Sequence, residues 1–257
     1  MTEYRLSQFD PTSTKEHRVW LIIGPRGSGK TVVLKDLLYH TKKRYHVPFA
    51  FTATNSTAEM FRELIPSTFV NDKGYNYETA DKILAQAKKM TRLKKKNKNF
   101  LMVLDDVAFD KKIFQSDCQR ELHLNGRHSK ITLFNTTQYV MTIPPLIRSN
   151  IDYVVVLQDS VIANRKRLYQ YFFGFFPNFQ DFDTVFKAVT EDNGALILDK
   201  TSTSTKINDT CFFYKAQVKL PLFRLGLPSF FEYDKQAKLE LRAQLQESDN
   251  CKVITIP

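Results

Sequence analysis

The stretch GPRGSGKT at residues 24–31 follows the apolar run VWLII at 19–23 and leads into the helix-forming stretch TVVLKDLLYH. It matches the Walker A pattern G-x-x-x-x-G-K-[ST], whose glycines let successive backbone N–H groups point into one phosphate-binding concavity. A following helix adds a favourable dipole for anions. The predicted nucleotide-binding residues are Gly24, Pro25, Arg26, Gly27, Ser28, Gly29, Lys30 and Thr31. Lys30 would reach the β- and γ-phosphates of ATP, and the Thr31 hydroxyl would ligate Mg²⁺.

Apolar runs and helical stretches alternate along most of the chain. After VWLIIG come VPFAFTAT, FLMVLDDV, ITLFNTTQ and IDYVVVL, with GALILDK and CFFYKAQV later. Continuous β-branched runs separated by helices predict a mostly parallel sheet with helices on both faces, an α/β fold. With 257 residues, 42% of them hydrophobic, we expect a single P-loop domain over 1–257. Its core would span about 17–200, and a C-terminal extension about 201–257.

The chain is basic, with 38 Lys and Arg against 27 Asp and Glu and a net charge of +11. This excess favours a polyanionic partner such as nucleic acid. The densest cluster, KKMTRLKKKNK at 88–98, closes a predicted helix over 78–96. These cations could equally be a solvated helix end or a nucleic-acid contact.

Neither the cysteines nor the hydropathy pattern suggests secretion or a membrane. Cys118, Cys211 and Cys251 make no paired framework, the N-terminus lacks a signal-like apolar region, and no apolar run spans a bilayer. A soluble, intracellular protein is expected. The aromatic cluster YQYFFGFF at 169–176 could touch a membrane, but core packing is favoured.

A second motif, FLMVLDDV at 100–107, ends an apolar run in two adjacent acids, as a Walker B strand does. Asp105 would hold Mg²⁺, and Asp106 falls where many ATPases place the carboxylate that polarises the attacking water. Taken alone, such acids could also begin a turn or cap a helix.

Three further residues surround the run ITLFNTTQ. Gln138, at its end, could contact the γ-phosphate or position water, or could be an ordinary turn residue. Arg127 precedes the run and Arg148 follows it; either could be an arginine finger or a surface arginine paired with an acid. Because neither lies in the P-loop, a finger would come from a neighbouring subunit, which implies a ring. A zinc site at Cys118, His123 and His128 is disfavoured because no fourth ligand stands at a suitable spacing.

The order GPRGSGKT, FLMVLDDV, NGRHSKITLFNTTQ and IPPLIRSNIDYVVVL is similar to that of the FtsK/HerA superfamily of DNA-pumping ATPases. More closely, it resembles the poxvirus-type genome-packaging ATPase of large double-stranded DNA viruses. The trailing LYQYFFGFFPNFQDFDTVFKAVTEDNGALILD extends the resemblance, which covers about residues 17–220.

This resemblance implies a RecA-like sheet with the Walker B strand beside the P-loop strand. It also implies a homo-oligomeric ring, a hexamer, that threads double-stranded DNA into a capsid through a capsid or portal-type protein. The protein would then act in a host-cell virus factory and in the assembling virion. By position, Gln138 would be the polar sensor and Arg127 the trans-acting finger. One departure is Asp106, where much of the superfamily has the longer Glu.

Two other functions are compatible with these nucleotide-binding motifs. A cellular HerA-type translocase or helicase in repair would load on free DNA ends and work with a nuclease. A P-loop kinase or GTP-type switch would need an acceptor pocket and lid or an N/T-K-x-D element, and the sequence shows neither.

Overall fold

The computed structural model describes the backbone of residues 3–107 and 112–249, with side chains up to residue 240. The strands are β1 (Ser7–Gln8), β2 (Val19–Ile23), β3 (Val47–Thr52), β4 (Val70–Asn71), β5 (Phe100–Asp105), β6 (Ile131–Thr137), β7 (Tyr153–Leu157), β8 (Ala195–Asp199) and β9 (Cys211–Tyr214). The α-helices are α1 (Lys30–Thr41), α2 (Asn55–Leu64), α3 (Tyr77–Arg92), α4 (Asp117–Asn125), α5 (Pro145–Ser149), α6 (Ile162–Phe172), α7 (Phe179–Thr190), α8 (Ile207–Thr210) and α9 (Pro228–Asp249). Short 3-10 turns include η3 (Ser67–Phe69), η5 (Gly126–Ser129) and η6 (Val140–Thr142).

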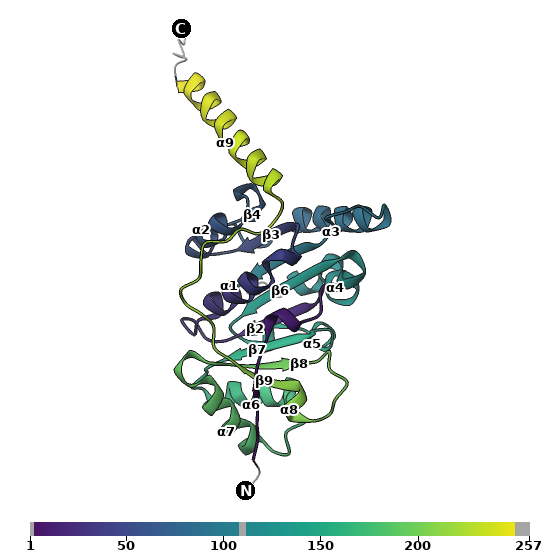
Figure 1. The fold of residues 1–257 in the computed structure, drawn as a ribbon, viewed down its shortest axis with the longest axis vertical. Helices are drawn as coiled ribbons and strands as arrows, with labels where there is room; N and C mark the ends of the chain where they lie inside the picture. The colour runs from purple at the N-terminus through teal and green to yellow at the C-terminus, as the bar shows by residue number, and fades with distance from the viewer. Residues whose placement is uncertain (1–2, 108–111, 250–257) are drawn as a thin grey trace.

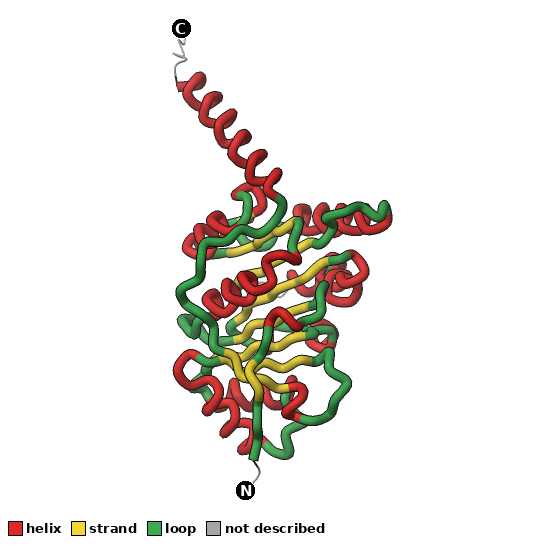
Figure 2. The backbone as a smooth tube through the Cα atoms, viewed as in Figure 1, coloured by secondary structure: helices red, strands yellow, loops and turns green. Residues whose placement is uncertain are grey.

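All described strands belong to one sheet, in the order β1-β9-β8-β7-β2-β6-β5-β3-β4. The six neighbouring strands β7, β2, β6, β5, β3 and β4 pair in parallel. β8 is antiparallel to both β7 and β9. Helices lie in front of and behind the strands (Figure 1, Figure 2). The predicted α/β fold with a mostly parallel sheet is confirmed.

The prediction that the Walker B strand lies beside the P-loop strand is wrong. β2, which leads into the P-loop, pairs with β6 and β7, and β6 separates it from β5, the strand that ends in the two acids. Strand order depends on contacts between distant segments, which no local pattern encodes. As a result, β6, which ends just before Gln138, lies between β2 and β5.

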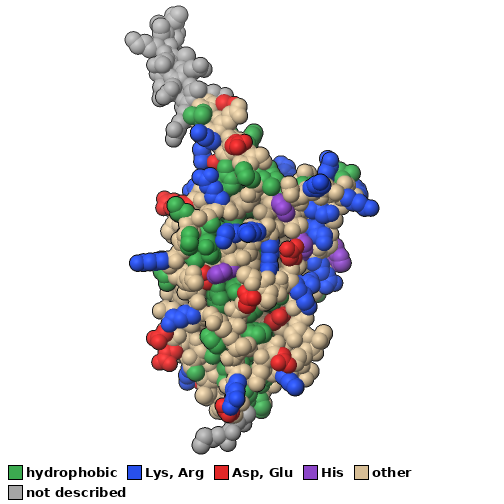
Figure 3. All heavy atoms as spheres, in the orientation of Figure 1, with side chains coloured by type: hydrophobic (Ala, Val, Ile, Leu, Met, Phe, Trp, Pro, Cys, Tyr) green, Lys and Arg blue, Asp and Glu red, His purple; other side chains and the backbone are tan. Residues whose placement is uncertain are grey.

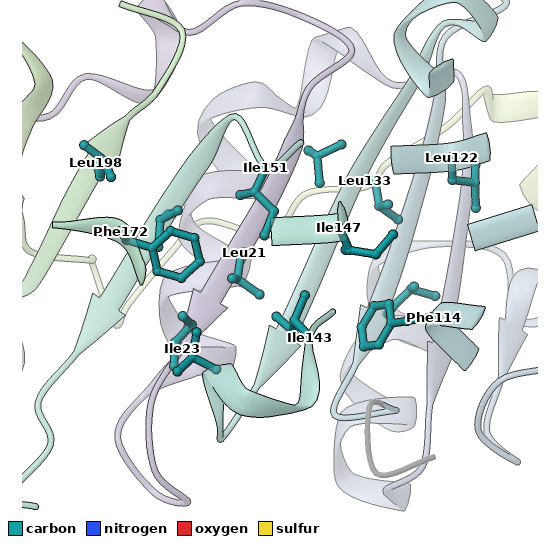
Figure 4. Packing of buried hydrophobic residues seen from close by; sticks show 14 of the residues in the cluster. Leu21, Ile23, Phe114, Leu122, Leu133, Ile143, Ile147, Ile151, Phe172 and Leu198 are labelled. Carbon is teal, nitrogen blue, oxygen red and sulfur yellow. The ribbon is translucent and has the colours of Figure 1, made fainter. Parts of the chain in front are cut away.

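Alternate residues of β2 face two separate cores. Leu21 and Ile23 pack with α3, α4, α5, α6 and α7 on one face, as the close view around Ile143 and Ile147 shows (Figure 4). Trp20 and Ile22 pack on the other face with α1 and α2. There the Trp20 ring stacks between Phe134 and Tyr153, with ring centroids 5.2 and 4.2 Å away. The central strands are therefore covered on both sides, as their continuous apolar runs predicted.

The region at 169–176 packs partly in the core: Phe172, Phe173 and Phe176 are buried, whereas Tyr171 and Phe175 are exposed. Phe173 and Phe176 are fully buried and contact Phe182 of α7. Among the described residues, no helix has the length and hydropathy needed to cross a bilayer.

After β9 the chain crosses α1 and α2 before it enters α9 (Figure 1). On this path Phe223 packs edge-on against Tyr39, and the Leu225 N–H donates to the Leu64 carbonyl. The side chain of Asp234 fixes the start of α9 by accepting from the Ser67 hydroxyl and the Thr68 N–H. Beyond this anchor, α9 projects away from the body (Figure 1).

The predicted helix over 78–96 is shorter than expected. α3 ends at Arg92, and Lys94 has a left-handed backbone, with φ 50°. The cations at 88–98 therefore divide between the last turn of α3 and a loop that leads into β5.

Candidate active site

The P-loop lies between the carboxyl end of β2 and the first residue of α1. Gly27 and Gly29 have φ values of 79° and 93°, a left-handed backbone that side chains rarely adopt. A Cβ on Gly24 would lie 2.4 Å from the Ser28 Oγ and 2.9 Å from the Leu157 Cβ, so a side chain there would clash. Both conformation and space therefore require glycine in this loop.

The Lys30 ammonium points into the loop. It is buried, and its Nζ donates to the carbonyls of Gly24 and Pro25 at 2.9 and 3.1 Å. Beside it, the Ser28 Oγ is buried with no hydrogen-bond partner. Carbonyl oxygens solvate an ammonium without neutralising it, and the Asp106 carboxylate lies 3.9 Å from Nζ, beyond hydrogen-bond distance. An unpartnered buried hydroxyl is also costly. An anionic phosphate would satisfy both the Lys30 ammonium and the Ser28 hydroxyl, so the loop fits the phosphates of a nucleoside triphosphate.

The first acid of the pair, Asp105, is buried at the end of β5. Its Oδ1 accepts from the Thr136 hydroxyl at 2.7 Å, and its Oδ2 from the Thr52 hydroxyl at 3.5 Å. Burial is the main reason that the pKa of Asp105 is raised; the Thr136 hydrogen bond opposes the rise and the nearby charge of Asp106 adds to it. A cation bound with the nucleotide would stabilise the ionised form.

The second acid, Asp106, connects the motifs. Its carboxylate Oδ2 lies 3.9 Å from the Lys30 Nζ and accepts from the Gln138 Nε2 at 3.3 Å. Its backbone is left-handed, with φ 49°, and its N–H donates to the Thr136 Oγ1. Such strain in a non-glycine residue concentrates at functional sites. The structure thus brings Lys30, Asp105, Asp106 and Gln138 together at the carboxyl edge, the edge formed by the carboxyl ends of the parallel strands.

Thr136 was missed by the sequence reasoning. Its hydroxyl donates to Asp105 and accepts from the Asp106 N–H, so one side chain orients both acids. Since side chains alternate along a strand, Thr136 shares a face with Gln138 two residues later. That period-2 pattern in NTTQ is the signal that would have found it.

The two arginines lie away from these residues. Arg127 is in η5 just before β6, and Arg148 is in the last turn of α5 just before β7, so both belong to the opposite, amino edge of the sheet. β6 alone separates the edges by roughly 20 Å, at about 3.3 Å per residue. Arg127 is exposed. Arg148 instead lies over the Tyr171 ring at 3.9 Å and donates to the Ile143 carbonyl at 2.7 Å. The Arg127 Nε donates to the Nε2 of the exposed His128 at 3.4 Å. An exposed cation that could reach a second molecule therefore fits Arg127 and not Arg148.

A buried polar chain connects α4 to the middle of β6. The His123 Nδ1 lies 2.8 Å from the Gln119 carbonyl, and its Nε2 lies 3.3 Å from the Asn135 Nδ2. The carbonyl requires a proton on Nδ1, so Nε2 accepts from the amide. Burial lowers the pKa of His123 to about 4, and the ring is neutral at pH 7. Both of its nitrogens are thus engaged within the protein.

Comparison with known proteins finds similar proteins in several viruses. The family model for the poxvirus A32 protein matches residues 7–170. Protein 088R of Invertebrate iridescent virus 3 is 34% identical over 195 residues, covering 76% of this chain and 74% of that protein. Protein L437 of Acanthamoeba polyphaga mimivirus is 26% identical over 244 residues, covering 91% and 84%. Both relatives carry the description "uncharacterized".

Two solved structures share the fold. The genome packaging NTPase B204 from Sulfolobus turreted icosahedral virus 2, in complex with AMP, aligns with a TM-score of 0.58 at 15% identity, covering 81% of this chain and all of that one. EssC (ATPases 2 and 3) from Geobacillus thermodenitrificans aligns with a TM-score of 0.54 at 17% identity, covering 90% of this chain and 45% of that one. The resemblance that the motifs predicted is confirmed: this chain is a P-loop ATPase and belongs to the poxvirus A32 protein family.

Proposed function

We propose that this chain is an ATP-driven translocase that moves double-stranded DNA into a viral capsid, and that it hydrolyses ATP at the subunit boundaries of a homohexameric ring. B204, which has a similar fold, is described as a genome packaging NTPase and as the DNA-packaging ATPase of its virus. The family match and the net charge of +11 support the same function.

The separation of the two site halves carries this proposal. The P-loop, both acids and Gln138 gather at the carboxyl edge, whereas the exposed Arg127 belongs to the amino edge of the same subunit. A head-to-tail ring brings opposite faces of neighbouring subunits together. Arg127 of one subunit would then complete the site of the next.

The residues of the carboxyl edge would act in sequence on Mg·ATP. Lys30 would exchange its two carbonyl contacts for the β- and γ-phosphates, while the loop N–H groups hold the phosphate oxygens. The Thr31 hydroxyl and the Asp105 carboxylate would hold Mg²⁺, and two such oxygen ligands suit an ion that keeps several waters. When bound, Mg²⁺ neutralises charge on the β- and γ-phosphates.

Asp106 and Gln138 would orient the attacking water. Aspartate is one methylene shorter than the glutamate common in the superfamily, and the left-handed backbone at Asp106 directs its carboxylate to Lys30 and Gln138. Gln138 donates to the same carboxylate. A change at the γ-phosphate would therefore shift Gln138 and, with it, the end of β6. Arg127 of the neighbour would stabilise charge in the transition state.

The remaining assignments belong to the same proposal. Residues 17–200 would be the motor core, and 201–257 an extension, although β9 at Cys211–Tyr214 adds a strand to the core sheet. The ring would dock on a capsid or portal-type protein, in the virus factory of the host cell and on the assembling virion.

Steady-state ATP hydrolysis tests this function when it is measured with and without long duplex DNA, over a range of protein concentrations. The specific activity should rise cooperatively with protein concentration, and DNA should stimulate it. A rate per subunit that is independent of both concentration and DNA would contradict a ring motor. Phosphorylation of an acceptor would instead support a kinase.

A further inference from the structure

The amino edge of the sheet carries basic residues in front of four neighbouring strands. KKRYH precedes β3, KKKNKN precedes β5, GRHSK precedes β6 and KEHR precedes β2. Backbone hydrogen bonds join these segments side by side, from the His46 N–H to the Asn99 carbonyl and from the Phe100 N–H to the Lys130 carbonyl. Lys and Arg side chains gather along this margin, the right-hand side of the view in Figure 3.

Many of these cations already have partners. Lys42 donates to the Tyr39 carbonyl and lies over its ring, Arg44 donates to the Thr14 carbonyl, and Arg18 faces Asp152. In the described part of the chain, six lysines of this edge have no ion pair and no side-chain hydrogen bond: Lys43, Lys94, Lys95, Lys96, Lys98 and Lys130. They form the group that we call the lysine row.

The backbone of the lysine row is strained where its charges are presented. Lys94 closes α3 in the left-handed conformation that glycine usually supplies, with the Lys95 N–H bonded to the Met90 carbonyl and the Lys94 N–H to the Thr91 carbonyl. Lys130 is also left-handed, with φ 58°. An L-residue at such a position is disfavoured relative to glycine. Folding alone would be better served by glycine at both turns.

From these observations we infer that the lysine row is the surface that contacts the phosphate backbone of duplex DNA, an inference that rests on the proposed translocase function. Exposed lysines suit this partner because they neutralise phosphates as point charges without reading sequence. An acidic protein surface fits less well, since lysine is depleted from the cores of protein interfaces.

The position of the lysine row also connects DNA to hydrolysis. Lys130 directly follows η5, the turn that carries Arg127, and its carbonyl accepts from the first residue of β5. DNA phosphates at this edge would therefore lie beside the finger. Contact with DNA can then favour the finger position that completes the neighbouring site.

A matched pair of triple variants tests the surface. Lys94, Lys95 and Lys96 are replaced by Gln in one variant, and Lys206, Lys215 and Lys219 in the control, which loses the same charge around β9 near the other end of the sheet. Binding of a fluorescent DNA duplex is measured across salt concentrations. Each lost phosphate contact lowers the slope of log K against log salt by about 0.9. We expect the first variant to lose about 2 to 3 in slope and roughly a hundredfold in affinity at 0.15 M salt, and the control to keep both.

Lys94→Gly separates binding from stability. It removes a charge and relieves the left-handed backbone, so the unfolding midpoint should rise while duplex affinity falls about fivefold at 0.15 M salt. Equal losses of affinity in both triple variants, or unchanged DNA binding in the lysine-row variants, would contradict the inference that the lysine row contacts DNA. Failure of the unmodified protein to bind duplex DNA would instead overturn the proposed function.

Discussion

The two edges of the sheet hold charged side chains in opposite ways. At the carboxyl edge, Lys30, Asp105 and Asp106 are buried or half-buried and held by neighbours within one subunit. At the amino edge, Arg127 and four residues of the lysine row are exposed, and the other two, Lys98 and Lys130, are half-buried. The difference supports the proposal that each subunit binds a nucleotide at its own carboxyl edge and presents the cations of its amino edge to another molecule.

The largest expected effect is at the P-loop. Lys30→Ala should remove measurable turnover, because the Lys30 ammonium is the charge that the Walker A pattern brings to the β- and γ-phosphates. Lys35→Ala, on the same helix, is the control and should keep the wild-type rate. Steady-state phosphate release measures both. Substantial hydrolysis by Lys30→Ala would refute the assignment of the carboxyl edge.

The next effect separates the two arginines. Arg127→Ala should lower kcat about a thousandfold and leave ATP binding intact, as expected for a finger that acts in the transition state. Arg148→Ala should keep kcat, because its guanidinium lies over Tyr171 and bonds to Ile143, and should cost about 1 kcal/mol of stability. Turnover and thermal unfolding of both variants decide this. The opposite pattern would make Arg148 the finger.

A smaller effect is expected at the end of β6, where Thr136 and Gln138 lie. Gln138→Ala should lower kcat about a hundredfold with little change in KM, because it loses the amide that donates to Asp106 and that we propose positions the attacking water. Thr136→Val should impair both Mg²⁺ dependence and kcat, since its hydroxyl contacts both acids. A change confined to KM in Gln138→Ala would argue against water positioning.

The smallest effect concerns stability and pH. Because burial raises the pKa of Asp105, its ionisation costs free energy in the fold that it does not cost in the unfolded chain. Asp105→Asn should therefore stabilise the nucleotide-free protein at pH 7 by about 1 kcal/mol, or about 2–4 °C in Tm, while it abolishes Mg²⁺-dependent turnover. This advantage should shrink as the pH falls through the raised pKa of the folded state, and it should vanish below the pKa of the unfolded chain, where the carboxyl is protonated in both states. Thermal unfolding at several pH values measures it, and a destabilised variant would contradict the cause given for the shift.

Local patterns predicted much of this molecule. The apolar runs marked β2, β3 and the strands from β5 to β9, and two motifs marked Lys30 and Asp105. The two-residue strands β1 and β4 had no such run and were not predicted. The position of β6 between β2 and β5 was not predictable, because pairing between distant strands leaves no local signal. The end of α3 was also missed, since Lys94 takes a left-handed conformation without the glycine that usually marks it.

Mixing of two inactive variants tests the central claim most directly. Arg127→Ala lacks the finger but keeps the acids, and Asp106→Asn lacks the acid but keeps the finger. If sites are completed between subunits, an equal mixture should regain activity at about one quarter of its interfaces, where each partner supplies its intact half. If every subunit used its own arginine, no mixing ratio would restore hydrolysis, and the account would be contradicted.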